Sequence, residues 1–221
     1  VSGPRSPANP GRGGGGGGRA AGVRPVRRRR ARVGGTGVFR GSQRLEALAL
    51  GTVGFRDLIG PLGHAPFWRD YLHRLSARKA SVVGLHVAVM VEPYLSLVLE
   101  GRKTVESRFG VHRRPPYDAV FAGDVILLKR VAGPIVGVAC AARTWCLSVN
   151  AATLGGIRRS FGERICAADD AFWEERRGAR YATLIELAEA TSAAAPVSCD
   201  KRDRRGWVTL RPRQLSLGLG L

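Results

Sequence analysis

The pattern of apolar and polar residues changes at Leu85. From there to residue 212 the chain alternates between short β-rich runs and helical stretches, whereas residues 1–45 contain few apolar residues. Apolar runs bounded by glycine, proline or charged turns predict strands. We expect them at 85–92, 103–109, 124–130, 133–147, 181–190 and 206–212.

Helical spacing accounts for most of the remaining chain. Pro93 suits the first turn of a short helix that Gly101 ends. Ile157, Phe161 and Ile165 recur at intervals of four, which predicts one helix, and Asp169 with Asp170 suits the N-cap and first turn of another. The order is β-α-β-β-β-α-α-β-β. Because most strands are short and consecutive, we predict an α+β fold built on a partly closed antiparallel barrel with flanking helices.

The N-terminal part has a different composition. Residues 1–84 hold 16 lysines and arginines but three acidic residues, within a chain of net charge +19. We predict that this segment is largely disordered, because it cannot bury enough apolar surface to offset the entropy of ordering. It is interpreted as a nucleic-acid tether, a tail of no consequence or a translated leader. Within it, residues 65–79 have the spacing of one amphipathic helix, either a docking helix or again leader.

This predicts a domain at 85–212 and a C-terminal tail at 213–221. The four cysteines and four histidines are scattered without zinc-ligand spacing, so we expect no metal, no cofactor and no disulfide framework. No apolar run approaches the roughly 20 residues that a membrane helix needs. We therefore expect a cytoplasmic protein with no membrane partner, and a monomer is favoured.

The run EGRKTVESRFG, residues 100–110, carries the candidate chemistry. Side chains alternate along a strand, so Glu106 and Arg108 point to one face while Val105 points to the other. Lys103, at the start of this strand, can reach the same space. A charged strand face exposed to solvent is the plain alternative to a binding cleft.

The segment EPYLSLVLEGRKTVESR resembles the signature of the ASCH domain family, in the PUA-like superfamily. Its G-x-K-x-x-E-x-R motif falls on Gly101, Lys103, Glu106 and Arg108. The resemblance extends over Leu85–Pro212 in the order and spacing of the later elements. It implies a PUA-like barrel with a cleft lined by the three charged motif residues.

The resemblance also implies a function. ASCH domains are thought to bind RNA or nucleotides, and some small members resemble enzymes that deacetylate acetylcytidine or cleave RNA. We therefore expect an RNA-, nucleotide- or nucleoside-binding domain, with a hydrolase of the same fold as the alternative. In that case Lys103 and Glu106 would be the catalytic pair. In the acetylcytidine hydrolases a threonine occupies the position of Glu106, so a direct transfer of that mechanism is in doubt.

Further candidates surround the motif. Tyr94 or Trp145 could stack on a base, although tryptophans such as Trp173 and Trp207 are more often core residues. Arg113 and Arg114 could contact phosphate or lie in a plain exposed loop, and Lys129 could face the cleft or end a solvated strand. The basic turn at 201–205 is either a rim for nucleic acid or a solubilising turn. The predicted ligand-binding residues are thus Tyr94, Lys103, Glu106, Arg108, Arg113, Arg114 and Lys129.

Overall fold

The computed structural model describes residues 65–77, 83–198 and 205–213. Its elements, in chain order, are α3 (Pro66–Ala77), β1 (Leu85–Met90), α4 (Tyr94–Leu99), β2 (Val105–Gly110), β3 (Val125–Arg130), β4 (Ile135–Ser148), α5 (Ala151–Ile165), α6 (Asp170–Glu174), β5 (Tyr181–Val197) and β6 (Trp207–Arg211). Each predicted strand and helix is present, with shifted ends. The predicted disordered tail before residue 65 and most of the basic turn at 201–205 lie outside the described residues.

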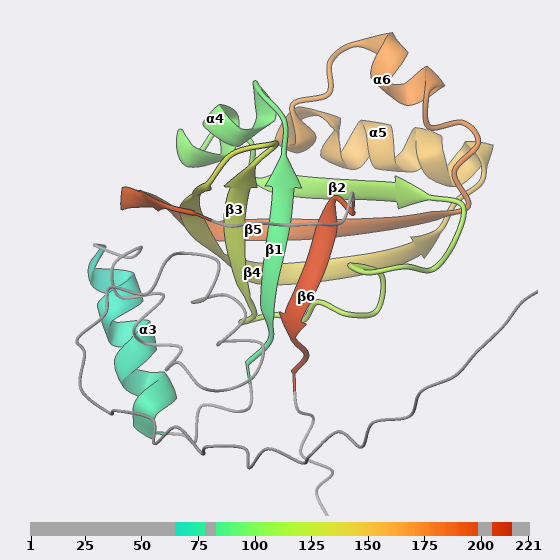
Figure 1. Cartoon of the computed structure of the whole chain (residues 1–221). Helices are drawn as coiled ribbons and strands as arrows, with labels where there is room; N and C mark the ends of the chain where they lie inside the picture. The colour runs from blue at the N-terminus through green and yellow to red at the C-terminus, as the bar shows by residue number, and fades with distance from the viewer. Residues whose placement is uncertain (1–64, 78–82, 199–204, 214–221) are drawn as a thin grey trace, which may run out of the picture. The chain divides into compact units, whose positions relative to one another are not determined.

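The strands form one curled sheet in the order β2-β5-β4-β3-β1-β6 (Figure 1). The long strands β4 and β5 pair along most of their length, and three register shifts interrupt their pairing. Such bulges bend a sheet and increase its twist. The prediction of an α+β fold on a partly closed barrel with flanking helices is confirmed.

One neighbouring pair departs from the predicted antiparallel arrangement. β1 and β3 run parallel, whereas β1–β6, β2–β5, β3–β4 and β4–β5 are antiparallel. The chain leaves β1 through α4, contributes β2 to the far edge of the sheet, and only then returns as β3. A crossover of that kind brings a strand back in the same direction, which consecutive hairpins cannot do.

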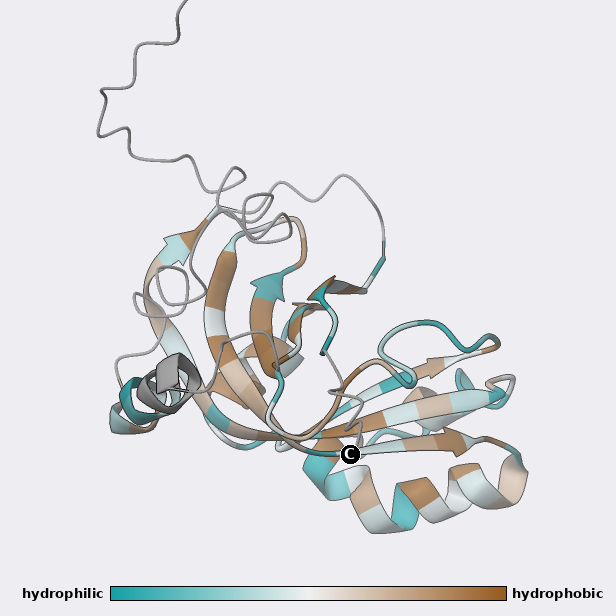
Figure 2. Cartoon of the chain, turned by 90° about the horizontal axis from the view of Figure 1, so that it is seen from below, coloured by the Kyte–Doolittle hydropathy of each residue, from teal (hydrophilic) through white to brown (hydrophobic). Residues whose placement is uncertain are grey.

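Alternation along the central strands separates the interior into clusters. Leu85 and Val87 of β1 pack in one cluster with Val125 and Leu127 of β3, whereas Ala88 packs with other β3 residues in a second. Apolar residues dominate these strands in Figure 2. A third cluster joins β2 and β5 to α5 and α6. Both faces of the middle of the sheet are therefore covered, which explains the unbroken apolar run of β3.

Helix α3 packs on the first of these clusters. Trp68 is completely buried, and its indole Nε1 donates to the carbonyl oxygen of Glu189 at 2.9 Å and to Thr191 Oγ1 at 3.1 Å. The predicted boundary at residue 85 leaves this helix outside the domain. The structure instead shows that α3 packs against the domain. The apolar ring of Trp68 is buried there, and its indole N–H has hydrogen-bond acceptors within β5.

The helices after β4 follow their sequence signals. Asn150 caps α5 by accepting from the backbone N–H of Thr153, and Asp169 caps α6 by accepting from that of Ala171. Ile157 and Ile165 are buried in the third cluster, as their spacing predicted. None of the described helices is long and apolar enough to cross a membrane.

Candidate functional site

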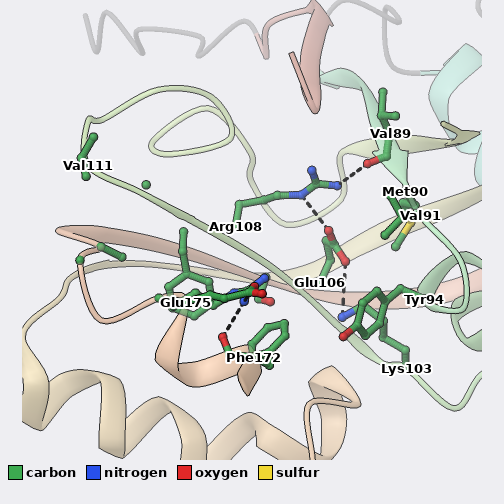
Figure 3. Close-up of a pocket in the computed structure, with 16 residues that line it drawn as sticks. Val89, Met90, Val91, Tyr94, Lys103, Glu106, Arg108, Val111, Phe172 and Glu175 are labelled. Carbon is green, nitrogen blue, oxygen red and sulfur yellow. Dashed lines mark hydrogen bonds and ion pairs between the residues drawn. The ribbon is translucent and has the colours of Figure 1, made fainter. Parts of the chain in front are cut away.

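Lys103, Glu106 and Arg108 converge (Figure 3). Lys103 Nζ lies 3.5 Å from Glu106 Oε2, and Arg108 Nε lies 2.7 Å from Glu106 Oε1. The carboxylate thus stands between two cations, each facing one oxygen. The solvated-face alternative is wrong for Glu106 and Lys103, which are buried.

Lys103 is held by the protein on several sides. It precedes β2, and its Nζ donates to the carbonyl oxygens of Val105 at 2.8 Å and Ile165 at 2.9 Å. The ammonium also lies 5.2 Å from the centre of the Tyr94 ring. Burial lowers the pKa of Lys103 below its usual range, and the nearby carboxylate of Glu106 only partly opposes this shift.

Arg108 joins the two edges of the open barrel. It lies on the edge strand β2, and its terminal nitrogens donate to the carbonyl oxygens of Val89 in β1 at 2.9 Å and Gly206, just before β6, at 3.2 Å. Its contact with Glu106 is an ion pair whose Nε–H direction does not meet hydrogen-bond geometry. Arg108 therefore has a structural task as well as a place in the site.

A pocket of about 620 Å³ opens beside these charges. It is bordered by the end of β1, the start of α4, the strand β2 and the turn after α6 (Figure 3). Its wall is made of apolar, aromatic and charged side chains together with exposed backbone. The lining residues most relevant to a ligand are Tyr94, Lys103, Glu106, Arg108, Phe172 and Arg176.

Aromatic rings and a second guanidinium form a further part of the wall of this pocket. Tyr94 and Phe172 meet edge to face with centroids 6.4 Å apart. The guanidinium of Arg176 lies 3.5 Å from the centre of the Phe172 ring, and Arg176 also donates to the Phe172 carbonyl oxygen. Aromatic rings and guanidinium planes of this kind can stack on a planar heterocycle.

A second pocket, of about 370 Å³, lies next to the first. The two pockets share Arg108 and residues 109–111 of the same strand. The loop between β2 and β3 contributes His112, Arg114 and Tyr117 to the second pocket, and Trp207 from β6 contributes to it as well.

The structure distributes the predicted site residues over several places. Tyr94, Lys103, Glu106 and Arg108 line the first pocket, and Arg114 lines the second. Arg113 lines neither described pocket, but its guanidinium lies 5.1 Å from the ring centre of Tyr181.

Lys129 lies apart from both described pockets. It is buried and donates to the carbonyl oxygens of Arg130 and Gly133 at the turn between β3 and β4. A register shift between Leu128 and Lys129 accompanies this position. Neither the cleft nor the solvated strand end that we predicted describes this lysine.

The three C-terminal tryptophans behave mainly as core residues. Trp173 and Trp207 are buried, and Trp145 packs against Phe161 with ring centroids 5.1 Å apart. The Trp207 ring still forms part of the second pocket, where Arg108 lies 5.6 Å from its centre.

Sequence reasoning missed the contribution of α6 and the turn that follows it. Phe172, Glu175 and Arg176 line the first pocket, although the segment was interpreted only as a helix followed by a strand. The available signal was an aromatic residue followed by charges of both signs. Nothing in the local sequence says that this turn faces β2.

The described part of the chain contains no cluster of three or more His, Cys, Asp or Glu side chains that could hold a metal ion. The described cysteines Cys140, Cys146 and Cys166 are free thiols, and burial raises the pKa of Cys140 to about 11.

Comparisons with known proteins give weak likenesses. No family model matches the chain, and no curated protein matches it. It resembles the crystal structure of ASCH from Zymomonas mobilis, at 14% identity and a TM-score of 0.41, over 52% of this chain and 73% of that one. A mutant form of the same protein gives 15% identity and a TM-score of 0.46, over 57% and 88%. Both belong to the family that the G-x-K-x-x-E-x-R motif indicated. At these values, nothing about their ligands or activity is transferred to this chain.

Proposed function

We propose that the protein binds RNA or a nucleotide, with a base held in the first pocket. The carrying observation is that the Lys103–Glu106–Arg108 array, in which Lys103 and Glu106 are buried, lines one pocket together with the aromatic wall of Tyr94 and Phe172. The array offers hydrogen-bonding groups for a base edge, and the wall offers a face for stacking.

Charge balance in this pocket supports a largely neutral ring as the buried part of the ligand. Its lining has three cationic side chains, Lys103, Arg108 and Arg176, and two carboxylates, Glu106 and Glu175. Glu106 is fixed by its two cations, so it can accept from a base amino group without first being ordered. Preorganisation of this kind reduces the entropy lost on binding.

Binding is favoured over catalysis by how the array is satisfied. The three hydrogens of the Lys103 ammonium face two carbonyl oxygens and one carboxylate. Among the described residues, no serine, threonine or cysteine side chain is hydrogen-bonded to Lys103 or Glu106. Nucleophilic catalysis needs such a pair, so this arrangement serves positioning better.

A hydrolase acting on a modified nucleoside or on RNA is the second candidate. The lowered pKa of Lys103 favours it, because an ammonium of reduced pKa gives up a proton more readily to a developing oxyanion. In that reaction class Glu106 would activate water and Lys103 would steady the developing oxyanion.

The proposal is tested by equilibrium binding of the full chain to the four ribonucleoside monophosphates and to a short single-stranded RNA. We expect Tyr94→Ala and Glu106→Gln each to weaken binding roughly tenfold, since they remove a stacking face and a charged acceptor. Glu163→Gln, at an exposed position on α5 outside both pockets, is the matched control and should bind as the parent does.

All variants keep the basic N-terminal segment, so its non-specific affinity for RNA cancels in the comparison. Equal binding by the parent, Tyr94→Ala and Glu106→Gln, with folding verified by circular dichroism, would refute the pocket as the binding site. Turnover of acetylcytidine or RNA by the parent that Lys103→Met abolishes would establish the hydrolase instead.

A further inference from the structure

The second pocket differs from the first in its charge. Its lining contains Arg108 and Arg114, together with His112, and no aspartate or glutamate. The first pocket balances its cations with two carboxylates. The two adjoining pockets therefore differ in charge: carboxylates offset most of the positive charge in the first, and none lines the second.

Hydrogen-bond capacity is left at the boundary between the pockets. Each terminal nitrogen of a guanidinium carries two hydrogens. In Arg108 each of these nitrogens donates one hydrogen bond, to Val89 or to Gly206, so each retains one further N–H. The group is fixed by two carbonyl oxygens and the Glu106 carboxylate, yet its side chain remains 23% exposed.

The loop after β2 supplies further positive charge. Arg114 is exposed, and the described residues give neither it nor His112 an acidic partner within ion-pair distance. Arg113 adds positive charge next to the second pocket, because its guanidinium lies 5.6 Å from the ring centre of Tyr117 and 5.1 Å from that of Tyr181. Both tyrosines line the pocket.

We propose that the second pocket is an anion subsite that takes a phosphate group of the ligand whose base occupies the first pocket. This inference rests on the proposed function and narrows it: the ligand is a nucleotide or an RNA phosphodiester, not a bare nucleoside. Arg108 contacts both parts of the ligand, and Arg114 with His112 completes the phosphate contacts. Guanidinium forks match phosphate oxygens in geometry and charge.

The test compares three probes on the full chain by isothermal titration calorimetry. These are the four ribonucleosides, their 5′- and 3′-monophosphates, and inorganic phosphate. We expect at least one monophosphate to bind roughly tenfold or more tightly than its nucleoside, as a charge-assisted contact predicts. Inorganic phosphate should reduce the affinity for that monophosphate but not for the nucleoside.

Arg114→Ala is the decisive variant, because Arg114 lines only the second pocket and is exposed. We expect it to remove most of the tenfold gain while leaving nucleoside affinity unchanged. Arg159→Ala, at an exposed position on α5, removes the same charge outside both pockets and should retain the gain. A general loss of positive charge would affect both variants equally.

The outcomes separate this inference from the function on which it rests. Nucleosides and monophosphates that bind equally overturn the anion subsite and leave base binding standing. A tenfold gain that survives Arg114→Ala overturns the assignment to this pocket. Inorganic phosphate binding that Arg114→Ala removes, with no nucleoside or nucleotide bound at all, supports the anion subsite and overturns the proposed nucleotide function.

Discussion

Arg108 combines contacts that hold the fold together with a place in the lining of both pockets. Two of its nitrogens bind carbonyl oxygens from β1 and from the residue before β6, while its third faces Glu106. Arg108 thereby links β2 to β1 and to the start of β6, at the residue that the two pockets share. A substitution that moves this guanidinium without removing it tests its structural role and its proposed role in ligand binding separately.

Gly206→Ala is such a change. A β-carbon at residue 206 would lie 2.8 Å from the Arg108 Nη1, so the guanidinium must shift. We expect nucleotide affinity to fall about tenfold and the free energy of unfolding to fall by about 1 kcal/mol, because a charged contact and a carbonyl bond are weakened. Calorimetric binding and urea unfolding measure the two effects.

Gly156→Ala is the matched control, since a β-carbon there meets nothing within 4 Å. It lies within α5, so it should raise stability by roughly 0.5–1 kcal/mol without changing affinity. Unchanged affinity in Gly206→Ala would show that the position of Arg108 does not matter for the ligand.

At the scale of elements, α3 belongs to the folded unit although the sequence boundary excluded it. The sequence showed the amphipathic spacing of α3. In the structure, Trp68 lies on the face of α3 that packs against the first hydrophobic cluster. What the sequence lacked was the partner: the Trp68 indole bonds to residues of β5 more than 100 positions away. Strand β5 extends to Val197 because its last residues pair with the start of β4. The small side chains at that end of β5 give no sequence signal for this pairing.

Trp68→Ala tests the docking of α3. We expect the free energy of unfolding to fall by about 3–5 kcal/mol, because a completely buried aromatic side chain leaves a cavity. Arg69→Ala, the next residue on the same helix and exposed, is the control and should change stability by about 0.5 kcal/mol or less. Equal losses in the two variants, measured by urea unfolding, would mean that the packing of α3 contributes nothing.

At the scale of the whole molecule, Asp124 joins segments that are distant in sequence. Its completely buried carboxylate accepts from the backbone of Gly84 and Phe121, faces His86 at 3.3 Å, and pairs with Arg213 at 3.0 Å. Burial alone raises the pKa of this carboxyl, but the contact with His86, the two backbone bonds and the Arg213 charge together lower it below its usual range. The folded protein therefore favours the ionised form of the Asp124 carboxyl group.

The lowered pKa of Asp124 determines how the stability of the protein changes with pH. Because the folded pKa of Asp124 is below its unfolded value of about 3.9, stability from this group is complete above that value and is lost as the pH falls below it. Asp124→Asn should lower stability at pH 7 by about 3 kcal/mol, since it leaves Arg213 without its buried partner. The difference from the parent should narrow at pH 3, as measured by urea unfolding at both values.

Asp118→Asn provides the matched control, because Asp118 is exposed and asparagine tolerates the same left-handed backbone. It should leave the acid dependence unchanged. A difference between Asp124→Asn and the parent that is constant from pH 7 to pH 3 would contradict the role given to the Asp124 carboxylate.

The sequence by itself determined the elements and the charged motif. Apolar runs, caps and glycine–proline punctuation are local properties, so they placed each strand and helix. The charged run at 100–110 and its resemblance to the ASCH signature singled out Lys103, Glu106 and Arg108. Only the tertiary structure decided that β1 and β3 run parallel, that α3 is docked, and that α6 and the turn after it line a pocket with β2. Those are contacts between distant segments, and they depend on how the sheet curls, which no local pattern records.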